Sequence, residues 1–293
     1  MHYKSYKSIL SPKNGMNIYR GCTHGCIYCD SRSNCYHMDH DFEDIEIKLD
    51  APIMLESELK KKRKKVMLGT GYMSDPYIHL ETKLQYTRKC LEIIEHYNFG
   101  LSIQTKSNRI LRDLDLLKKI NEKSKCVVLT TMTTFDENLC KIIEPNVSTT
   151  KERFEMLLEM KANNIPTVVW FSPFLPLIND TYENIEGLLK YCVEAGVKGI
   201  IFFGIGLTLR EGNREYFYDK LDELFPGMKQ KYIRTYGNLY ECISPNNVEL
   251  SKLIKKTCQK YNIMNSPNEI FSYLREYESK SLSNQISFFD DIN

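Results

Sequence analysis

The sequence predicts an α/β fold, an open partial barrel of six β/α units followed by a helical extension. Short apolar segments alternate with helical patterns from about residue 66 to residue 224, which favours a parallel sheet with right-handed crossovers. Counting one N-terminal strand, the pattern supplies six strands, fewer than the eight of a closed barrel. Glycine and polar residues follow the predicted strands, and that end of a parallel barrel carries its chemistry.

The N-terminal part contains two predicted strands and one helix. Residues 1–13 are basic without an apolar pattern, so we expect an irregular lead-in there. Residues 16–20 are the first predicted strand, and alternating apolar residues over 42–49 predict another. A helix over 52–60 begins at Pro52, because proline is well tolerated in a first helical turn.

Strands and helices then alternate in a regular order. Gly196 ends one of the predicted helices and Pro226 follows another, as expected from the conformations of these residues. The predicted strands cover residues 66–70, 101–105, 126–132, 167–172 and 199–204, and the helices that follow them cover 80–97, 110–121, 151–163, 182–195 and 214–224.

The alternation stops after residue 236. Apolar residues at helical spacing predict a helix over 247–261 and a shorter one over 268–277, followed by a polar tail. We therefore expect three parts: the barrel over residues 1–235, the helical extension over 236–278, and a flexible tail over 279–293.

Three cysteines with C-x3-C-x2-C spacing are the strongest chemical signal. Cys22, Cys26 and Cys29 are too close in sequence to converge from one helical face, so they must lie in an irregular loop. Three thiolates leave one position of a metal site vacant, and a cubane cluster held this way offers one iron to an outside ligand. The alternative is a structural zinc site completed by a further ligand, for which His24, Cys35 and His37 are available, although zinc sites usually contain paired C-x2-C units.

Composition limits the cellular setting. The remaining seven of the ten cysteines are scattered, which fits a reducing cytoplasm rather than a disulfide framework. The N-terminus lacks the apolar core of a signal peptide, and no apolar run approaches the length of a membrane span. The net charge of +2 provides no overall field toward nucleic acid. We predict a cytoplasmic protein with no membrane association.

The motif C-x3-C-x-aromatic-C after a short strand resembles the radical S-adenosylmethionine (radical SAM) superfamily. The wider match, over about residues 15–226, resembles the spore photoproduct lyase-like branch. The resemblance implies a partial TIM-type barrel, a [4Fe–4S] cluster and S-adenosylmethionine. It also implies that the cofactor's amino and carboxylate groups bind the open iron. Reductive cleavage would then give a 5′-deoxyadenosyl radical that takes hydrogen from a substrate.

Several strand ends contain candidate cofactor ligands. Gly69 and Thr70 end the second strand, where glycine lets backbone groups approach a ligand; alone this is a weak signal. The next segment, Ser74-Asp75-Pro76-Tyr77 with Glu81 beyond it, resembles the (T/S)-D-P-Y segment of the branch, although Asp-Pro alone indicates a turn.

The third and fourth strand ends continue the resemblance. Lys106 and Ser107 match its T-K-S motif, which implies contacts to the methionyl or ribose groups; the alternative for Lys106 is a solvated loop lysine. Thr131 lies where the family has a cofactor-binding serine. The resemblance also places Tyr28 near the adenine, and a tyrosine that covers the cluster is the alternative.

Glu144 and Arg153 match the E-P pair and the following arginine of the branch. If they are buried and face each other, they would pair or bind the zwitterionic end of S-adenosylmethionine. A salt bridge on a helix surface is the alternative for Arg153.

The sequence departs from the branch at its hydrogen donor. Spore photoproduct lyases contain a donor cysteine two residues before the serine of the T-S-D motif, and here that position is Tyr72. A tyrosine can still pass a hydrogen atom or an electron, but the missing thiol argues against spore photoproduct lyase activity itself. Cys242, after the barrel, is a candidate replacement donor.

Three features favour DNA as the substrate, or recruitment of the protein to DNA. The branch includes a DNA repair enzyme, which is an analogy of limited weight. The basic run over residues 60–65 could contact phosphate, although such runs at helix ends are usually solvated. The tail resembles the Q-L-(S/D)-L-F peptide that docks on bacterial sliding clamps, and a terminus presents such motifs well; it could instead fold back onto the body. The motif residues are Gln285, Ile286, Ser287, Phe288 and Phe289.

These features predict a cytoplasmic radical SAM enzyme, lyase-like, that acts on DNA in lesion repair or modification. An electron donor such as flavodoxin or ferredoxin would reduce the cluster. Two alternatives stay open: a radical SAM enzyme that acts on a peptide or small molecule, and a non-catalytic iron–sulfur adaptor bound to the clamp.

Overall fold

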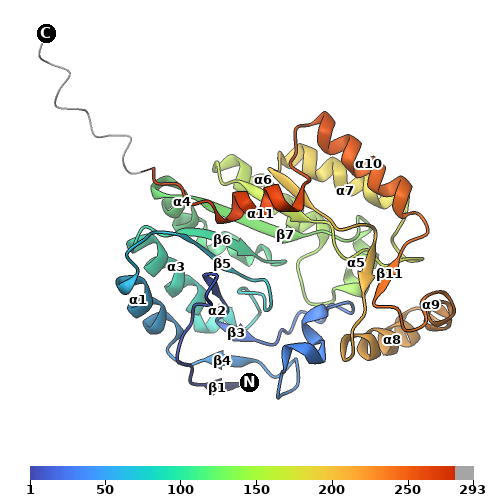
Figure 1. Cartoon of the computed structure of the whole chain (residues 1–293), viewed down its shortest axis with the longest axis horizontal. Helices are drawn as coiled ribbons and strands as arrows, with labels where there is room; N and C mark the ends of the chain where they lie inside the picture. Colours follow the sequence, from blue (N-terminus) through green and yellow to red (C-terminus); the bar gives the residue numbers. More distant parts are fainter. Residues whose placement is uncertain (281–293) are drawn as a thin grey trace, which may run out of the picture.

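Six parallel strands form the central sheet of the protein, whose computed structural model describes residues 1–280. Strands neighbour each other in the order β2-β5-β6-β7-β8-β9, so each crossover advances the sheet by one strand (Figure 1). This arrangement confirms the predicted α/β fold, an open partial barrel. The strands are β2 (Gly15–Met16), β5 (Met67–Thr70), β6 (Gly100–Gln104), β7 (Cys126–Thr131), β8 (Thr167–Trp170) and β9 (Gly199–Ile201).

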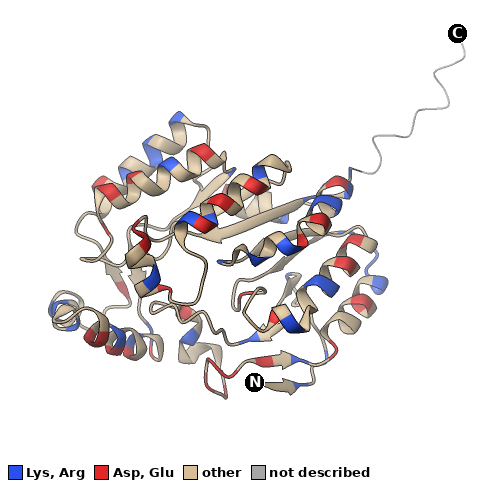
Figure 2. Ribbon diagram, turned by 180° about the vertical axis from the view of Figure 1, so that it is seen from behind, with Lys and Arg blue, Asp and Glu red and all other residues tan. Residues whose placement is uncertain are grey.

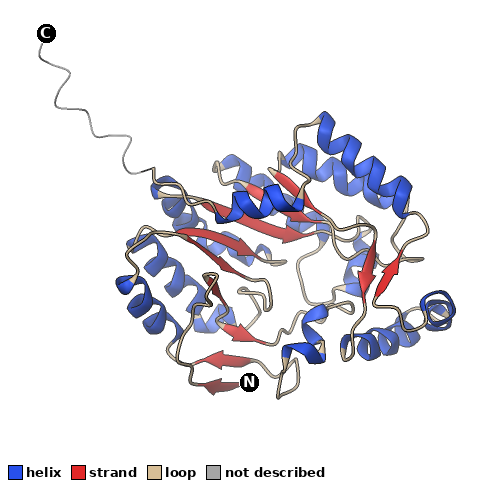
Figure 3. Ribbon diagram, viewed as in Figure 1, coloured by secondary structure: helices blue, strands red, loops and turns tan. Residues whose placement is uncertain are grey.

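Helices cover the convex face of this sheet (Figure 3). One side of the strands, including Leu68, Leu101, Val128 and Val169, packs in the large core with these helices. The boundaries of all but one of them agree with the predictions to within a few residues, because each follows an apolar stripe at helical spacing. They are α1 (Ala51–Lys61), α3 (Tyr86–His96), α4 (Leu114–Lys123), α6 (Thr150–Ala162) and α7 (Tyr182–Ala195).

The C-terminal helix α11 (Pro267–Arg275) covers the concave face, as Figure 1 shows in front of β6 and β7. Its buried Ile270 and Leu274 share a separate cluster with the inward side chains of the strands. An open barrel leaves this apolar surface uncovered, and α11 removes it from water. The inward side chains are Met67, Val127, Leu129, Val168 and Ile201.

The single helix predicted over 80–97 is two helices, α2 (Glu81–Leu84) and α3. Gln85 lies between them in the left-handed region, with φ of 54°. The fully buried Glu81 causes the break, because its carboxylate accepts a hydrogen bond of 3.1 Å from the amide of Thr87 in the first turn of α3. A side-chain acceptor thus replaces a helical bond at this start.

The N-terminal prediction was also too simple. Instead of one strand over 16–20, the chain leaves β2 and enters β3 (Tyr19–Arg20), which pairs with β4 (Glu46–Lys48) in a second sheet. The lead-in expected to be irregular contains β1 (His2–Lys4), parallel to β4. Arg20 is therefore the last residue of a strand in this side sheet (β1, β4 and β3), immediately before the cysteine loop.

Beyond β9 the chain builds one side of the molecule. β10 (Gly206–Thr208) pairs antiparallel with β11 (Glu241–Ile243). Cys242, the candidate hydrogen donor, therefore lies in a strand. The helices here are α8 (Asn213–Leu224), α9 (Met228–Tyr236) and α10 (Asn247–Lys260), and the shorter elements elsewhere are η1 (Asp30–Arg32), η2 (Asn34–Tyr36), η3 (Asn108–Asp113) and α5 (Glu137–Ile143).

Charges of both signs are mixed over the helices (Figure 2). In the predicted basic run, Lys60 pairs with Glu56 at 2.9 Å, and Lys62 donates to the Asn14 side chain at 2.8 Å. No helix among residues 1–280 has the length and apolar character to cross a membrane. The predicted clamp motif lies outside the described residues.

Candidate functional site

A cavity of about 690 Å³ lies at the carboxyl ends of the central strands. Its wall combines the cysteine loop, residues that follow β5 and β6, the ends of β7 and β8, and the antiparallel pair β10 and β11. This is where a parallel barrel is expected to carry its chemistry.

Cys22, Cys26 and Cys29 all line this cavity as free thiols. Distant backbone groups hold the loop between them: the Cys22 amide donates to the Phe42 carbonyl at 3.0 Å, and the Ile27 amide donates to the Ile143 carbonyl at 3.0 Å. The fixed backbone presents the three sulfur atoms to one space, as the spacing predicted.

The donor set fits an iron–sulfur cluster better than a single zinc ion. Zn–S bonds of about 2.3 Å require sulfur atoms roughly 4 Å apart. Among the described residues, the groups of three ligand atoms within 4.8 Å of one another do not include these cysteines. A cubane separates its sulfur ligands further, and three thiols leave one iron open.

Two such groups of ligand atoms do occur in the side sheet, around His40. They combine it with His2 and Asp44, or with Asp39 and Glu46. Cations already contact the carboxylates: Lys4 lies 3.1 Å from Asp39 and 3.2 Å from Glu46, and the amino group of Met1 contacts Asp44. These groups therefore form a salt-bridge network.

Asp75 joins the turn that follows β5 to the segment that follows β6. Its carboxylate accepts hydrogen bonds from the Tyr77 amide at 2.8 Å, the Thr105 hydroxyl at 2.7 Å and the Lys106 amide at 2.8 Å. The turn indicated by Asp-Pro thus also fixes the T-K-S segment. The Asp-Pro pair in the sequence indicated the turn, but it did not indicate which groups donate hydrogen bonds to the Asp75 carboxylate.

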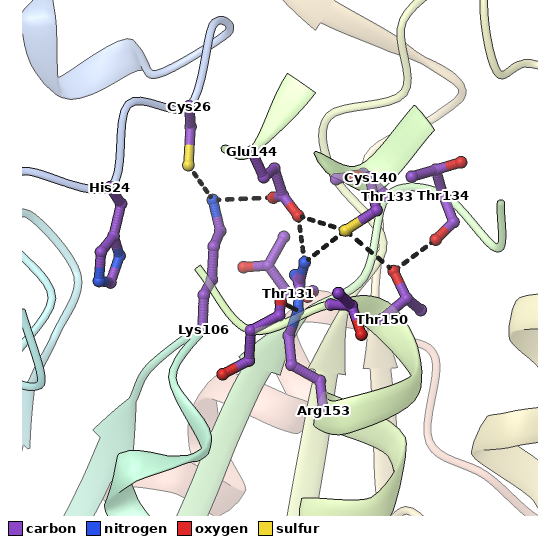
Figure 4. Close-up of polar contacts among 12 residues, drawn as sticks. His24, Cys26, Lys106, Thr131, Thr133, Thr134, Cys140, Glu144, Thr150 and Arg153 are labelled. Atoms are coloured by element: carbon purple, nitrogen blue, oxygen red, sulfur yellow. Dashed lines mark hydrogen bonds and ion pairs between the residues drawn. The ribbon is translucent and has the colours of Figure 1, made fainter. Parts of the chain in front are cut away.

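Behind the cavity, Glu144 accepts contacts from four side chains, of which Figure 4 shows Arg153, Lys106 and Cys140; the Cys140 sulfur lies 3.6 Å from the carboxylate. Arg153 pairs with one carboxylate oxygen, while Lys106 at 3.3 Å and the Tyr28 hydroxyl contact the other. Burial alone would raise the pKa of Glu144, but the charges of Arg153 and Lys106 outweigh it and lower the pKa to about 2. Glu144 is therefore ionised at neutral pH.

Two of the three cysteine sulfurs, those of Cys22 and Cys26, are protonated in the absence of a metal. Burial raises the pKa of Cys26 to about 12, against the opposing charge of Lys106, and burial likewise raises the pKa of Cys22. Cofactor binding must therefore release protons from these thiols.

The structure brings most predicted site residues to the cavity wall. Besides the three cysteines, these are Tyr28, Tyr72, Ser74, Lys106, Thr131 and Cys242.

Five predicted residues do not line the cavity: Gly69, Thr70, Ser107, Glu144 and Arg153. A Cβ on Gly69 would approach the Tyr72 ring to 2.8 Å, so this glycine makes room for that side chain. Ser107 caps η3 by accepting from the Arg109 amide. Arg153 is fully buried, which excludes the helix-surface salt bridge.

Sequence reasoning missed several wall residues. Gln104 and Trp170 line the cavity with a buried acceptor, Oε1, and a buried donor, Nε1, that have no protein partner among the described residues. Unpaired buried polar atoms beside a cavity are suited to a ligand. Their positions at strand ends were the available signal, but the residues belong to no motif. Phe203, Arg210 and Tyr240 also line it.

Comparisons with known proteins identify the family of this chain. The profile of the Radical SAM superfamily matches residues 16–192. An uncharacterized protein of Mycobacterium tuberculosis is 28% identical over 229 residues, covering 75% of this chain, and the match spans 66% of that relative's length. An uncharacterized protein of Methanocaldococcus jannaschii is 33% identical over 184 residues, 62% of this chain and 68% of its own length.

Solved structures support the fold. A spore photoproduct lyase complexed with dinucleoside spore photoproduct has a TM-score of 0.60 at 12% identity, over 85% of this chain and 74% of its own. A mutant with bound AdoMet and the same ligand has a TM-score of 0.56 at 13% identity, over 83% and 71%. The sequence match confirms the predicted superfamily and its cofactors, a [4Fe–4S] cluster and S-adenosylmethionine: the chain belongs to the radical SAM superfamily.

Proposed function

We propose that this protein is a radical SAM enzyme that acts on a nucleic acid, with DNA as the substrate, in lesion repair or modification. When bound, the two cofactors would supply a 5′-deoxyadenosyl radical that abstracts hydrogen from the substrate. The convergence of three free thiols on one cavity, with the Lys106 ammonium beside Cys26, carries the enzymatic part of this proposal.

The cavity rim supports a nucleic-acid substrate. Phe203 is 65% exposed and Tyr240 is 45% exposed, and both line the cavity beside Arg210. The Arg210 guanidinium donates to the Tyr240 hydroxyl at 2.8 Å. Exposed aromatic faces stack on unpaired bases, worth about 1–3 kcal/mol per base, and an arginine can contact phosphate. Together these side chains fit a base that leaves its stack to reach the cavity.

Cys242 and Tyr72 are our candidates for hydrogen transfer after substrate activation. Both line the cavity, and burial raises the pKa of Cys242 to about 11. The thiol therefore keeps its hydrogen at neutral pH, as a hydrogen-atom donor must. The Tyr72 hydroxyl lies 2.9 Å from the Ser102 hydroxyl.

The first experiment is anaerobic reconstitution with iron and sulfide, followed by dithionite and S-adenosylmethionine. We expect 5′-deoxyadenosine from the wild type and none from Cys26→Ala. Cys35→Ala is the matched control, because Cys35 is exposed and does not line the cavity. No 5′-deoxyadenosine from a wild type with a reduced cluster would refute the enzymatic proposal and favour the adaptor alternative.

The substrate is tested separately, with lesion-containing and undamaged oligonucleotides. We expect binding that weakens in Phe203→Ala and Tyr240→Ala. If 5′-deoxyadenosine forms but the oligonucleotides neither bind nor react, the peptide or small-molecule alternative is favoured.

Two protein partners complete the proposal. A flavodoxin or ferredoxin would supply the electron, and the motif over residues 285–289 would recruit the enzyme to a sliding clamp. Binding to a purified bacterial clamp should be lost in the double variant Phe288→Ala/Phe289→Ala. Equal binding by the wild type and this variant would contradict the docking role.

A further inference from the structure

The buried group behind the cavity contains more positive than negative charge. Arg153 and Glu144 have fully buried side chains, and Lys106 is 17% exposed. The two cations share one carboxylate, so one positive charge has no partner within the group. Such a charge is costly to bury unless a further anion lies close to it.

Arg153 cannot be the cation that faces the cavity. Its guanidinium donates to the Ser148 carbonyl at 2.9 Å and to the Thr131 carbonyl, lies 3.3 Å from the Cys140 sulfur, and pairs with Glu144. Figure 4 shows that Arg153 contacts Glu144 and Cys140, whereas Lys106 is the cation that contacts Cys26. The surplus charge is therefore carried by Lys106.

Lys106 directs this charge at a cluster cysteine. Its Nζ lies 3.4 Å from the Cys26 sulfur and 3.0 Å from the Tyr28 hydroxyl. Asp75 fixes its backbone amide, and Glu144 holds the ammonium from the other side at 3.3 Å. Within residues 1–280, the sulfur atoms of Cys22 and Cys29 have no comparable cationic donor.

We propose that Lys106 raises the reduction potential of the cluster by donating a hydrogen bond to Cys26, and that Glu144 and Tyr28 are positioning residues for it. This inference rests on the proposed function. Reduction adds one negative charge at the thiolate-bound cluster, and a buried cation at hydrogen-bond distance stabilises the reduced form more than the oxidised form. The residues thus make the electron transfer to the cluster easier.

This role differs from the one that the family resemblance implies. A lysine that only binds the methionyl or ribose groups of S-adenosylmethionine affects cofactor affinity and leaves the potential of the cofactor-free cluster unchanged. A lysine that donates to Cys26 changes that potential. The two roles can therefore be measured separately.

The test is a redox titration of the reconstituted cluster, followed by EPR in the absence of S-adenosylmethionine. For Lys106→Met we expect roughly a tenfold lower ratio of reduced to oxidised cluster at a fixed potential, which is a shift of about 59 mV to more negative potential for one electron. Lys106→Arg keeps the positive charge, so its cluster potential should stay close to that of the wild type. Arg210→Met is the matched control, because it removes a cation from the same cavity wall that contacts Cys35 instead.

If Lys106→Met does not retain a cluster, Tyr28→Phe carries the test. It removes one contact to the ammonium without changing the charge, and a smaller shift in the same direction is expected. The inference is overturned if the potential is unchanged in whichever of Lys106→Met and Tyr28→Phe keeps its cluster, or if Arg210→Met shifts the potential equally. As long as the wild type still forms 5′-deoxyadenosine, these results leave the proposed function intact. A wild type that assembles no cluster would overturn the proposed function as well.

Discussion

Gly71 passes so close to Gln104 that a Cβ on Gly71 would overlap the Gln104 carbonyl oxygen and approach its carbonyl carbon to 2.8 Å. Gly71 also has a φ of 91°, a conformation that glycine adopts without strain. Both residues line the cavity. This contact closes the gap between the ends of β5 and β6, and it lets their following segments form one wall.

Gly71→Ala should therefore lower stability by more than its backbone strain of about 1–2 kcal/mol, because the two strand ends must separate. Gly227→Ala is the control, since Gly227 has a φ of 82° but no atom within 4 Å of an added Cβ. Urea unfolding should show a clearly larger loss for Gly71→Ala. Equal losses of unfolding free energy in the two variants would mean that the backbone at Gln104 moves away from the added Cβ without cost.

Arg153→Met should lower the free energy of unfolding by about 3–5 kcal/mol, because it leaves the buried Glu144 carboxylate without its main partner. Arg234→Met, at an exposed position on α9, should change it by less than about 0.5 kcal/mol. The double variant Glu144→Gln/Arg153→Met should recover part of the loss in the same denaturant titrations. No recovery would show that Arg153 acts mainly through the carbonyls of Thr131 and Ser148.

Stability should also depend on pH through Glu144. The pKa of this group is lowered from 4.5 to about 2 in the folded protein. Its contribution, on the order of 3 kcal/mol, is therefore fully present above pH 4.5 and is lost as the pH falls toward 2. The difference in unfolding free energy between the wild type and Glu144→Gln should shrink between pH 5.5 and roughly pH 3.5. A difference that stays constant would contradict the lowered pKa.

Cys242→Ser should separate the two halves of the proposed reaction. Because Cys242 is proposed to act after hydrogen abstraction, the variant should still form 5′-deoxyadenosine but lose product. Wild-type product formed in D₂O should contain deuterium, since a thiol hydrogen exchanges with solvent. Cys35→Ser, at an exposed cysteine that does not line the cavity, should behave like the wild type. Normal product from Cys242→Ser with normal deuterium content would transfer the role to Tyr72.

The contact of α11 with the concave face is open to a simple test. Ile270→Ala should cost about 2–5 kcal/mol, because Ile270 is fully buried against the inward side chains of the sheet. Ile233→Ala, at a position that is 47% exposed on α9, should cost much less. Thermal unfolding of both variants measures the difference. Similar losses would indicate that α11 contributes little to the stability of the sheet.

The elements that could be predicted from the sequence have a local signal. α7 was predicted with its observed bounds, because its apolar stripe ends at Gly196, whose φ of 64° suits a helix end. The helix predicted over 80–97 was wrong at Gln85, because the break depends on the Glu81 carboxylate. Glu81 also accepts from Arg112 at 3.0 Å, a partner from a distant segment.

The features of the candidate site also divide into those with a local sequence signal and those that depend on distant segments. The spacing of Cys22, Cys26 and Cys29 predicted a shared ligand set, since a few intervening residues limit how far the thiols can separate. The sequence could not show that the Tyr28 hydroxyl contacts the Glu144 carboxylate, 116 residues away in the chain. It also could not show that Lys106 carries the surplus positive charge of the buried group formed with Glu144 and Arg153.

The sequence by itself therefore determined the order of the central strands and of the main helices between them, the cysteine loop and the family resemblance, because each rests on periodicity or spacing between near neighbours. Only the tertiary structure decided that α11 covers the concave face, that β11 brings Cys242 to the cavity, and that Arg153 neutralises Glu144 behind it. Those contacts join segments far apart in the chain, and packing shape and buried charge select them rather than local pattern.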